Sequence, residues 1–374
     1  MRTSLTLGKI VGIPIRVHSS WFLVLTLVTW SLAGGYFPQE YPGWTTVTYW
    51  FVGLVTAILF FASVLFHELG HSMVALCQGV SVRSITLFIF GGVAQIGGEP
   101  STAGAEFRIA LAGPLTSLGL ATIFGLLKLG IVFSSPLAAV VTYLGRINLM
   151  LALFNLTPGF PLDGGRVLRA VLWGLGGSFC QATRWASAIG QGVAFMFILF
   201  GMWQMFLGGF LNFLNGLWIA FIGWFLNNAA ESSYRQVLLR DRLVGVTARN
   251  VMAQECPTVS GDLLLDRLVN DHILNTGRRY FFVTQDGELK GLITLHNVKK
   301  MPRDRWNEVT VHQVMTPVGT LLWARPDQGM WALLQRMDEA DVNQVPVMDD
   351  KRLVGMITRE HLLRQVRIRS ELGI

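Results

Sequence analysis

The first 228 residues contain very few acidic side chains. They hold five of the 23 aspartates and glutamates of the chain, and residues 229–374 hold the other 18. Cysteine is scarce as well, since Cys77, Cys180 and Cys256 are the only three and lie far apart. This argues against a disulfide framework and against a zinc site built from clustered cysteines.

The chain is also more apolar than an ordinary soluble protein, with a mean hydropathy of +0.47 and 52% hydrophobic residues. Because the acidic residues are so unevenly distributed, we expect a membrane domain followed by a soluble one. The formal charge of +7 divides into +5 for residues 1–228 (ten basic minus five acidic) and +2 for the remainder (20 minus 18). These cations are typical of membrane flanks, and no nucleic-acid partner is expected.

Six segments of the first part are apolar and long enough to cross a bilayer. They run approximately over residues 19–37, 47–71, 106–128, 136–156, 186–207 and 209–227. We expect the first to be an uncleaved span, because about 20 residues precede it and its apolar run exceeds that of a signal peptide. The distribution of Arg and Lys around the segments predicts a multi-pass protein of the cell membrane with both termini cytoplasmic.

A metal-binding motif, His67-Glu68-Leu69-Gly70-His71, stands at the end of the second apolar segment. On a helix, this spacing places two imidazoles one turn apart on one face, where both can bind a zinc ion. The glutamate between them can act as general base on the metal-bound water. Ionisable residues at membrane depth are costly and usually functional. The motif therefore predicts a zinc hydrolase whose metal lies inside the bilayer.

Two imidazoles leave a catalytic zinc one protein ligand short. Asp163 is the favoured third ligand, because it follows the fourth apolar segment and should arrive at the same face as His71. Pro158 and Pro161 interrupt regular helix before it, which lets the backbone bend toward a buried metal. Glu106 is a weaker candidate for the third ligand. The alternative role for Asp163 is that of a helix N-cap.

These segments resemble the site-2 protease family of intramembrane zinc metalloproteases. The resemblance rests on His67-Glu-Leu-Gly-His71, Asn155-Leu-Thr-Pro-Gly-Phe-Pro-Leu-Asp163-Gly-Gly, Ala112-Gly-Pro-Leu115 and Gly91-Gly92. It implies that His67, His71 and Asp163 bind one Zn²⁺ per chain and that Glu68 activates water. It also implies a substrate that is a transmembrane segment, cut near the cytoplasmic side. The family's third span often has Asn where this chain has Ser117, to which we assign no catalytic role.

The stretch 82–96 alternates in the manner of a β-hairpin, with Gly91-Gly92 as its turn. A free strand edge beside the metal-binding helix can pair with an unwound substrate by strand addition. The alternative is a closed structural hairpin. Gly91, Gly92 and Asn155 are candidates for positioning the substrate, and the Asn155 amide can donate a hydrogen bond to the substrate carbonyl or its oxyanion.

Two further polar residues lie on the fourth apolar segment. Asn148 is expected to make an interhelical hydrogen bond. Arg146 should lie at membrane depth, so a buried partner or a water-filled route is expected for it.

Residues 247–366 repeat with a period of about 64 residues. Val251-Met252 returns as Val314-Met315, and Gly291-Leu-Ile-Thr294 returns as Gly355-Met-Ile-Thr358. Each copy is expected to form a helix, two strands joined by a polar turn, and a short helix. This part resembles a tandem pair of CBS domains, which often dimerise and sense adenosine nucleotides. The resemblance implies a homodimer and a nucleotide site at Thr294 and Thr358.

In that family, an Asp after the Thr holds the ribose hydroxyls, and here Asn297 and His361 take its place. The loss of both carboxylates weakens the case for a nucleotide. The alternative is a module for dimerisation or partner docking.

The sequence thus predicts a polytopic α-helical membrane protein of about six transmembrane helices with a membrane-associated β-hairpin, plus a cytoplasmic α/β CBS pair. The expected domains are 1–228 for the metalloprotease, 229–246 for a linker, and 247–303 and 309–366 for the CBS repeats. The favoured function is cleavage of transmembrane segments near the cytoplasmic face, in regulated intramembrane proteolysis modulated by the CBS pair. The alternatives are a CBS-gated transporter or channel, and a catalytically silent relative that binds helices.

Overall fold

The computed structural model describes residues 4–89, 91–130, 135–350 and 352–372. It divides into two compact units, Met1–Val237 and Leu238–Ile374. The domain limits expected from the sequence remain predictions. The helix that contains the last apolar run continues without interruption to Leu243, through most of the expected linker.

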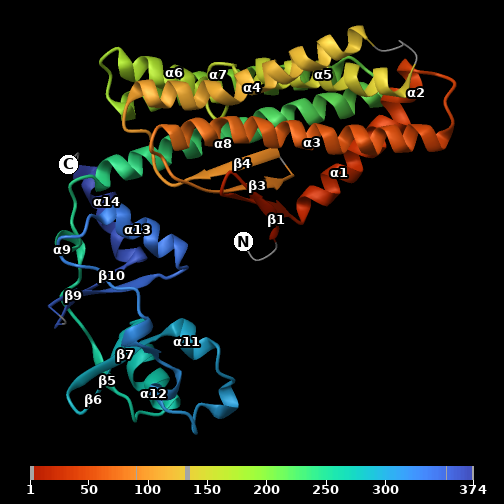
Figure 1. Cartoon of the computed structure of the whole chain (residues 1–374). Helices are drawn as coiled ribbons and strands as arrows, with labels where there is room; N and C mark the ends of the chain where they lie inside the picture. The colour runs from red at the N-terminus through yellow and green to blue at the C-terminus, as the bar shows by residue number, and fades with distance from the viewer. Residues whose placement is uncertain (1–3, 90, 131–134, 351, 373–374) are drawn as a thin grey trace. The chain divides into compact units, whose positions relative to one another are not determined.

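Within the described residues, six helices are long and apolar enough to cross a membrane (Figure 1). The first combines α1 (Ser20–Ser31), the π-helix η1 (Leu32–Tyr36) and α2 (Phe37–Glu40). The other five are α3 (Thr46–Cys77), α4 (Ala103–Leu129), α5 (Pro136–Asn155), α7 (Phe179–Phe206) and α8 (Phe210–Leu243). The expected number of membrane helices is therefore confirmed, and most of these helices are longer than their apolar runs.

Helix α3 shows why a helix exceeds its apolar run. It begins at Thr46, where the Thr45 side chain accepts a hydrogen bond from the Thr48 backbone N–H at 3.2 Å. It then continues past His71 to Cys77, and Gly79 follows with a φ of +75°. The prediction that the metal-binding motif ends the helix was wrong, because no helix-breaking residue follows before Gly79. Both imidazoles therefore stand inside a continuous helix.

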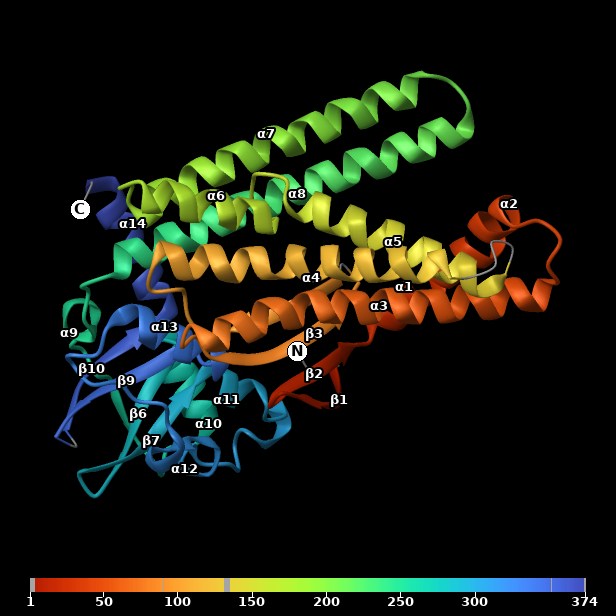
Figure 2. The same ribbon diagram turned by 45° about the horizontal axis from the view of Figure 1, so that its top comes forward.

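The membrane helices pack through small and apolar side chains. One buried cluster joins α1, η1, α3 and α5, with Leu32, Val52, Ala139 and Leu144 among its members. Asn148 on α5 donates to the Ser63 hydroxyl on α3 at 3.1 Å, so the expected interhelical hydrogen bond is confirmed. Helices α7 and α8 form an antiparallel pair whose backbones approach closely at glycine residues (Figure 2).

A four-stranded sheet packs against α3, in the order β1-β2-β3-β4 (Figure 1). The strands are β1 (Ser4–Ile10), β2 (Ile13–His18), β3 (Val82–Phe88) and β4 (Gly91–Ile96). Strand β2 runs parallel to β3, and the other neighbours are antiparallel. The side chains of Ile13, Ile15 and Ile85 pack on Leu69 of α3. One face of the sheet is thereby fixed to the helix that carries the metal-binding motif.

The expected hairpin over 82–96 is present, but its turn was placed wrongly. Phe88 pairs with Gly91 and Leu87 pairs with Gly92, so both glycines belong to β4. Gly91, at the start of the strand, has a φ of +118°, a conformation that favours glycine.

Strands β1 and β2 were not predicted. Their signal was present in the alternation of Ile13, Ile15 and Val17, which are all buried, with less buried residues between them. As a result, the hairpin over 82–96 belongs to a larger sheet, and β1 and β4 form its two edges.

The second unit contains two similar repeats. The first has α9 (Ala248–Val251), β5 (Thr258–Ser260), α10 (Leu265–Arg267), the π-helix η2 (Leu268–Leu274), β6 (Tyr280–Gln285), β7 (Glu288–Thr294) and α11 (Leu295–Lys299). The 3₁₀-helix η3 (Arg303–Arg305) leads to the second. That repeat has α12 (Val311–Val314), β8 (Thr316–Pro317), the 3₁₀-helix η4 (Val318–Thr320), α13 (Met330–Glu339), β9 (Gln344–Asp349), β10 (Arg352–Thr358) and α14 (Arg359–Leu372).

The first residues of each repeat pair with a strand of the other repeat. Thr316, at the start of the second repeat, pairs with Leu292 of the first, and Ala253, at the start of the first, bridges to Met356 of the second. Phe282, Leu292 and Met356 are buried in a cluster that contains residues of both repeats. The unit is therefore a single module with internal two-fold similarity, as expected for a CBS pair.

Candidate metal centre

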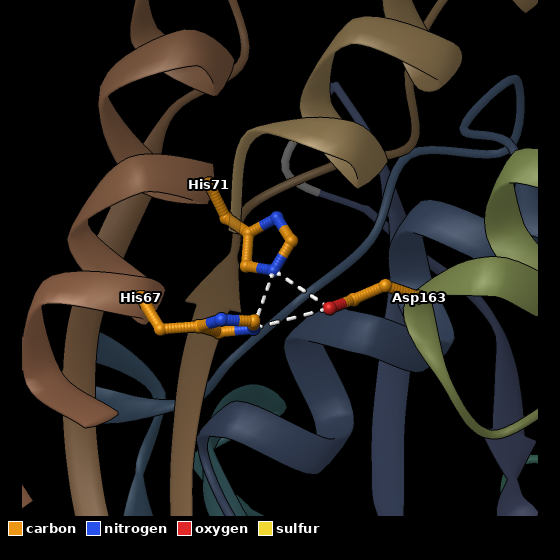
Figure 3. Close-up of side chains that lie close together, drawn as sticks. All are labelled: His67, His71 and Asp163. Atoms are coloured by element: carbon orange, nitrogen blue, oxygen red, sulfur yellow. Dashed lines mark hydrogen bonds and ion pairs between the residues drawn. The ribbon is translucent and has the colours of Figure 1, made fainter. Parts of the chain in front are cut away.

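His67 and His71 on α3 converge with Asp163, the first residue of α6 (Asp163–Gly174), as Figure 3 shows. The Nε2 atoms of the two imidazoles lie 3.2 Å apart. The Oδ2 atom of Asp163 lies 3.1 Å from each of them. Both imidazoles are buried, with 4% of their surface exposed. The structure thus brings together the three residues expected to bind the metal.

The triangle of these atoms fits one zinc ion. Atoms bound to a tetrahedral zinc at about 2.0–2.1 Å lie about 3.3–3.4 Å from one another. The three observed separations are close to that value, and two imidazole nitrogens with one carboxylate oxygen form a usual set of ligands for a catalytic zinc.

The other ring nitrogens have partners that suit this role. His71 donates its Nδ1–H to the Ile109 carbonyl at 2.7 Å, and His67 Nδ1 lies 2.9 Å from the Ser117 hydroxyl. A proton on Nδ1 leaves Nε2 free to bind a metal. Both partners lie on α4, so this helix fixes the orientation of both rings.

Asp163 is placed by the start of a helix. Its carboxylate is at the positive end of the α6 dipole, which stabilises a negative charge. The dipole therefore favours the ionised carboxylate, which is the form that binds a metal.

Gly113 keeps open the space between the imidazoles. A Cβ atom at this position would lie 2.1 Å from Nε2 of His71 and 2.7 Å from Nε2 of His67. The first of these is about the distance at which a zinc ion binds an imidazole nitrogen. Any side chain at Gly113 would therefore occupy the volume that the metal needs.

Glu68 lies beside the cluster and against β4. Its Oε2 accepts a hydrogen bond from the Ala94 backbone N–H at 3.2 Å. A Cβ at Gly92 would come within 2.5 Å of the Glu68 Cγ, so only glycine lets the strand pass this close. The expected general base thus stands between the metal ligands and an edge strand.

The remaining candidates are placed as follows. Asn155 is the last residue of α5 and is half-buried, and Gly91 begins β4.

Glu106 is fully buried and paired with Arg169, outside the three-residue cluster, so its choice as alternative metal ligand was wrong. Arg146 is exposed and donates to the Tyr36 hydroxyl at 3.3 Å. This contact is not a buried ion pair, and a water-filled route for Arg146 stays a prediction.

Comparison with protein families agrees with this geometry. The profile of Peptidase family M50 matches residues 55–133 and 124–199, and the profile of the CBS domain matches residues 311–368. A Synechocystis protein named as a zinc metalloprotease is 35% identical over 97% of this chain and 96% of its own length. The chain belongs to peptidase family M50.

Other members of this family are similar over nearly their whole length. Rip3 of Mycobacterium tuberculosis, also named as a zinc metalloprotease, is 35% identical over 98% of this chain and 93% of its own. A zinc metalloprotease of Methanocaldococcus jannaschii is 29% identical over 98% and 97%. Among solved structures, the site-2 protease of that organism is 31% identical, with a TM-score of 0.43 over 62% of this chain and 95% of its own.

Family membership gives the coarse identity of the protein. It is a multi-pass membrane protein of the site-2 protease family, with a CBS pair. Relatives named as zinc metalloproteases support zinc as the metal. Membership in the family implies a membrane protein as the substrate.

The sequence did not indicate that α4 supplies the partners of both imidazoles and the glycine that lies between them. Ile109, Gly113 and Ser117 are spaced four residues apart, so they lie on one face of that helix. The first accepts from His71, the second leaves room for the metal, and the third contacts His67. The regular spacing was visible in the sequence, but only the structure shows that this face meets α3.

Gly113→Ala should abolish zinc binding, because the added methyl group occupies the metal position. We expect wild type to bind about one zinc per chain after purification, and the variant to bind almost none, by elemental analysis. The control is Gly119→Ala on the same helix, where an added Cβ meets no atom within 4 Å. Full zinc content in Gly113→Ala would contradict this assignment of the metal position.

Proposed function

We propose that the protein is a zinc endopeptidase that cleaves transmembrane segments of membrane proteins near the cytoplasmic face. In this proposal His67, His71 and Asp163 bind the metal, and Glu68 is the general base. The supporting observation is the convergence of the three ligand atoms beside Glu68, on a helix apolar enough to span a membrane. Ionisable residues at such depth are costly, and those that are present are usually functional.

The chemistry follows from the residue types. A zinc ion at this site would polarise the scissile carbonyl and lower the pKa of water. Glu68 accepts the proton of the attacking water and then gives it to the amide nitrogen as the C–N bond breaks. Asn155 is proposed to donate a hydrogen bond to the carbonyl oxygen on which negative charge develops.

Strand β4 is proposed to hold the substrate backbone. As the last strand of its sheet, it pairs with β3 on one side only within the described residues. The Ala94 N–H donates to Glu68 rather than to β3. Backbone groups of an edge strand point alternately toward and away from its partner strand, so those of β4 that point away from β3 lie on the side of Glu68. A substrate unwound to an extended strand can pair with this edge and bring its peptide bond beside Glu68. Gly92 leaves room for Glu68 beside the strand, and Gly91 and Gly92 are proposed to help position the substrate backbone.

If β4 binds an extended substrate, the substrate helix must open first. Substrates with Gly, Pro or Asn near the cleavage point should be cut faster than variants with Leu there, because those residues weaken a helix. The measurement compares cleavage rates of matched substrates in the same detergent. Equal rates for the two sets would contradict strand addition.

The decisive test of proteolysis is a comparison of cells that carry wild type or Glu68→Gln. Mass spectrometry of newly formed peptide ends should find fragments that end inside transmembrane segments only with wild type. Loss of the base should reduce cleavage by about 10²–10⁴-fold while zinc remains bound. Identical fragments in both cells would contradict the role of Glu68.

The same test addresses the alternatives. A silent relative that binds helices would give no fragments with either protein. A CBS-gated transporter or channel would also give none, and membership in a peptidase family already favours the protease over both.

The orientation is a further part of the proposal. The excess of Arg and Lys at one set of helix ends supports cytoplasmic termini in the cell membrane. The metal ligands would then lie near the cytoplasmic face.

The CBS pair is proposed to modulate the protease and to form a homodimer. A cleft of about 870 Å³ lies between its repeats, lined by Thr358, by His361 and by the cations Arg278, Arg279 and Lys299. Such cations suit the phosphates of a nucleotide. Thr294 caps α11, and its hydroxyl donates to the Asn297 amide oxygen at 2.5 Å. Asn297 stands at the position of the Asp that would hold a ribose in the CBS family.

A further inference from the structure

The first unit contains a buried ion pair between an arginine and a glutamate. Arg169 on α6 has 6% of its surface exposed, and its partner Glu106 on α4 has none. Arg169 donates through Nε to Glu106 Oε1 at 2.7 Å and through Nη2 to the same oxygen. Burying two charges costs several kcal/mol per ion before their attraction is counted, so such a pair is weak evidence for added stability.

The guanidinium of Arg169 contacts several of the segments around Asp163. Its Nη1 lies 3.4 Å from the Thr183 hydroxyl on α7. Its Cζ lies 4.9 Å from the centre of the Phe160 ring and 4.4 Å from that of Phe179. Phe160 belongs to the loop that delivers Asp163, and Phe179 begins α7. One side chain therefore contacts the loop, the next helix and α4.

Glu106 connects this cluster to the imidazoles. It lies one turn before Ile109, whose carbonyl accepts from His71, on the same helix as Gly113 and Ser117. The chain of contacts thus runs from Asp163 along α6 to Arg169, across to Glu106, and along α4 to the partners of both rings. Asp163 comes from a segment about 90 residues away from the imidazoles in sequence, and this pair spans the gap.

The pair is not optimised for stability. Glu106 Oε2 is buried and has no hydrogen-bond partner among the described residues. An unsatisfied carboxylate oxygen costs free energy that an apolar pair of similar size would not. A role in geometry explains why a pair with this cost is present.

We propose that Arg169 and Glu106 are positioning residues that hold Asp163 at bonding distance from the metal. The pair touches neither the metal nor the substrate, and it acts through Asp163. This inference rests on the proposed metal site.

The test is a double-mutant cycle on zinc affinity, measured by competition with a chelator on the purified full chain. Glu106→Gln in the wild-type chain should weaken zinc binding about tenfold, the lower end of the effect of losing a group bonded directly to a metal ligand, because Glu106 acts one step further away. In a chain that already carries Asp163→Asn, the same change should weaken it less than about twofold. The control Arg184→Gln removes an exposed cation on α7 and should change neither.

A second variant separates positioning from folding. The double substitution Glu106→Leu, Arg169→Leu removes both charges together, so it should keep the thermal midpoint of the metal-free chain within a few degrees. Its zinc affinity should still fall about tenfold. Wild-type zinc affinity in this variant would overturn the proposal.

The outcomes distinguish this inference from the proposed function. Failure of wild type to bind zinc, or an Asp163→Asn chain with unchanged affinity, would contradict the metal site itself. A metal site that responds to Asp163→Asn but not to Glu106→Gln would overturn the positioning role alone. An equal loss in both backgrounds would show that the pair acts through general stability, and would also overturn it.

Discussion

The convergence of His67, His71 and Asp163, which come from two distant segments, is the contact on which the rest of the candidate site depends. The two imidazoles are easily supplied, because one turn of α3 sets their spacing. The carboxylate is harder, because it comes from another helix that must be held to within a few tenths of an ångström. Much of the local architecture, from the short helix α6 to the face of α4, can be understood as meeting this requirement.

The apolar surroundings raise the importance of every polar contact. An unpaired polar group in such a setting costs several kcal/mol, so each ring nitrogen opposite the metal needs a partner. The carbonyl of Ile109 and the hydroxyl of Ser117 meet this need. Because both belong to α4, the packing of α4 on α3 aligns the rings, and a glycine at the point of closest approach leaves the volume between them free.

The sequence predicted what local rules determine. Apolar length identified the six membrane helices, and fixed spacing identified His67 and His71. Asp163 could be chosen because few acidic residues were available in the membrane half. The repeat of the second half was also visible, because it preserves short marker segments such as Val251-Met252.

The sequence did not predict what depends on contacts between distant segments. The pairing of β2 with β3 joins residues about 70 positions apart, and no local rule indicates it. The Glu106–Arg169 pair was missed for the same reason, and Glu106 was considered as a ligand because the membrane half offers few acidic residues. The turn before β4 was misplaced, since glycine suits both a turn and a strand that must pass close to Glu68.

Zinc-edge X-ray absorption of the purified chain is the most direct test of which residues bind the metal. Two imidazole nitrogens and oxygen ligands at about 2.0–2.2 Å are expected, with one oxygen lost or displaced in Asp163→Asn. A sulfur ligand at about 2.3 Å, or a spectrum that Asp163→Asn leaves unchanged, would contradict the claim that His67, His71 and Asp163 form the metal centre.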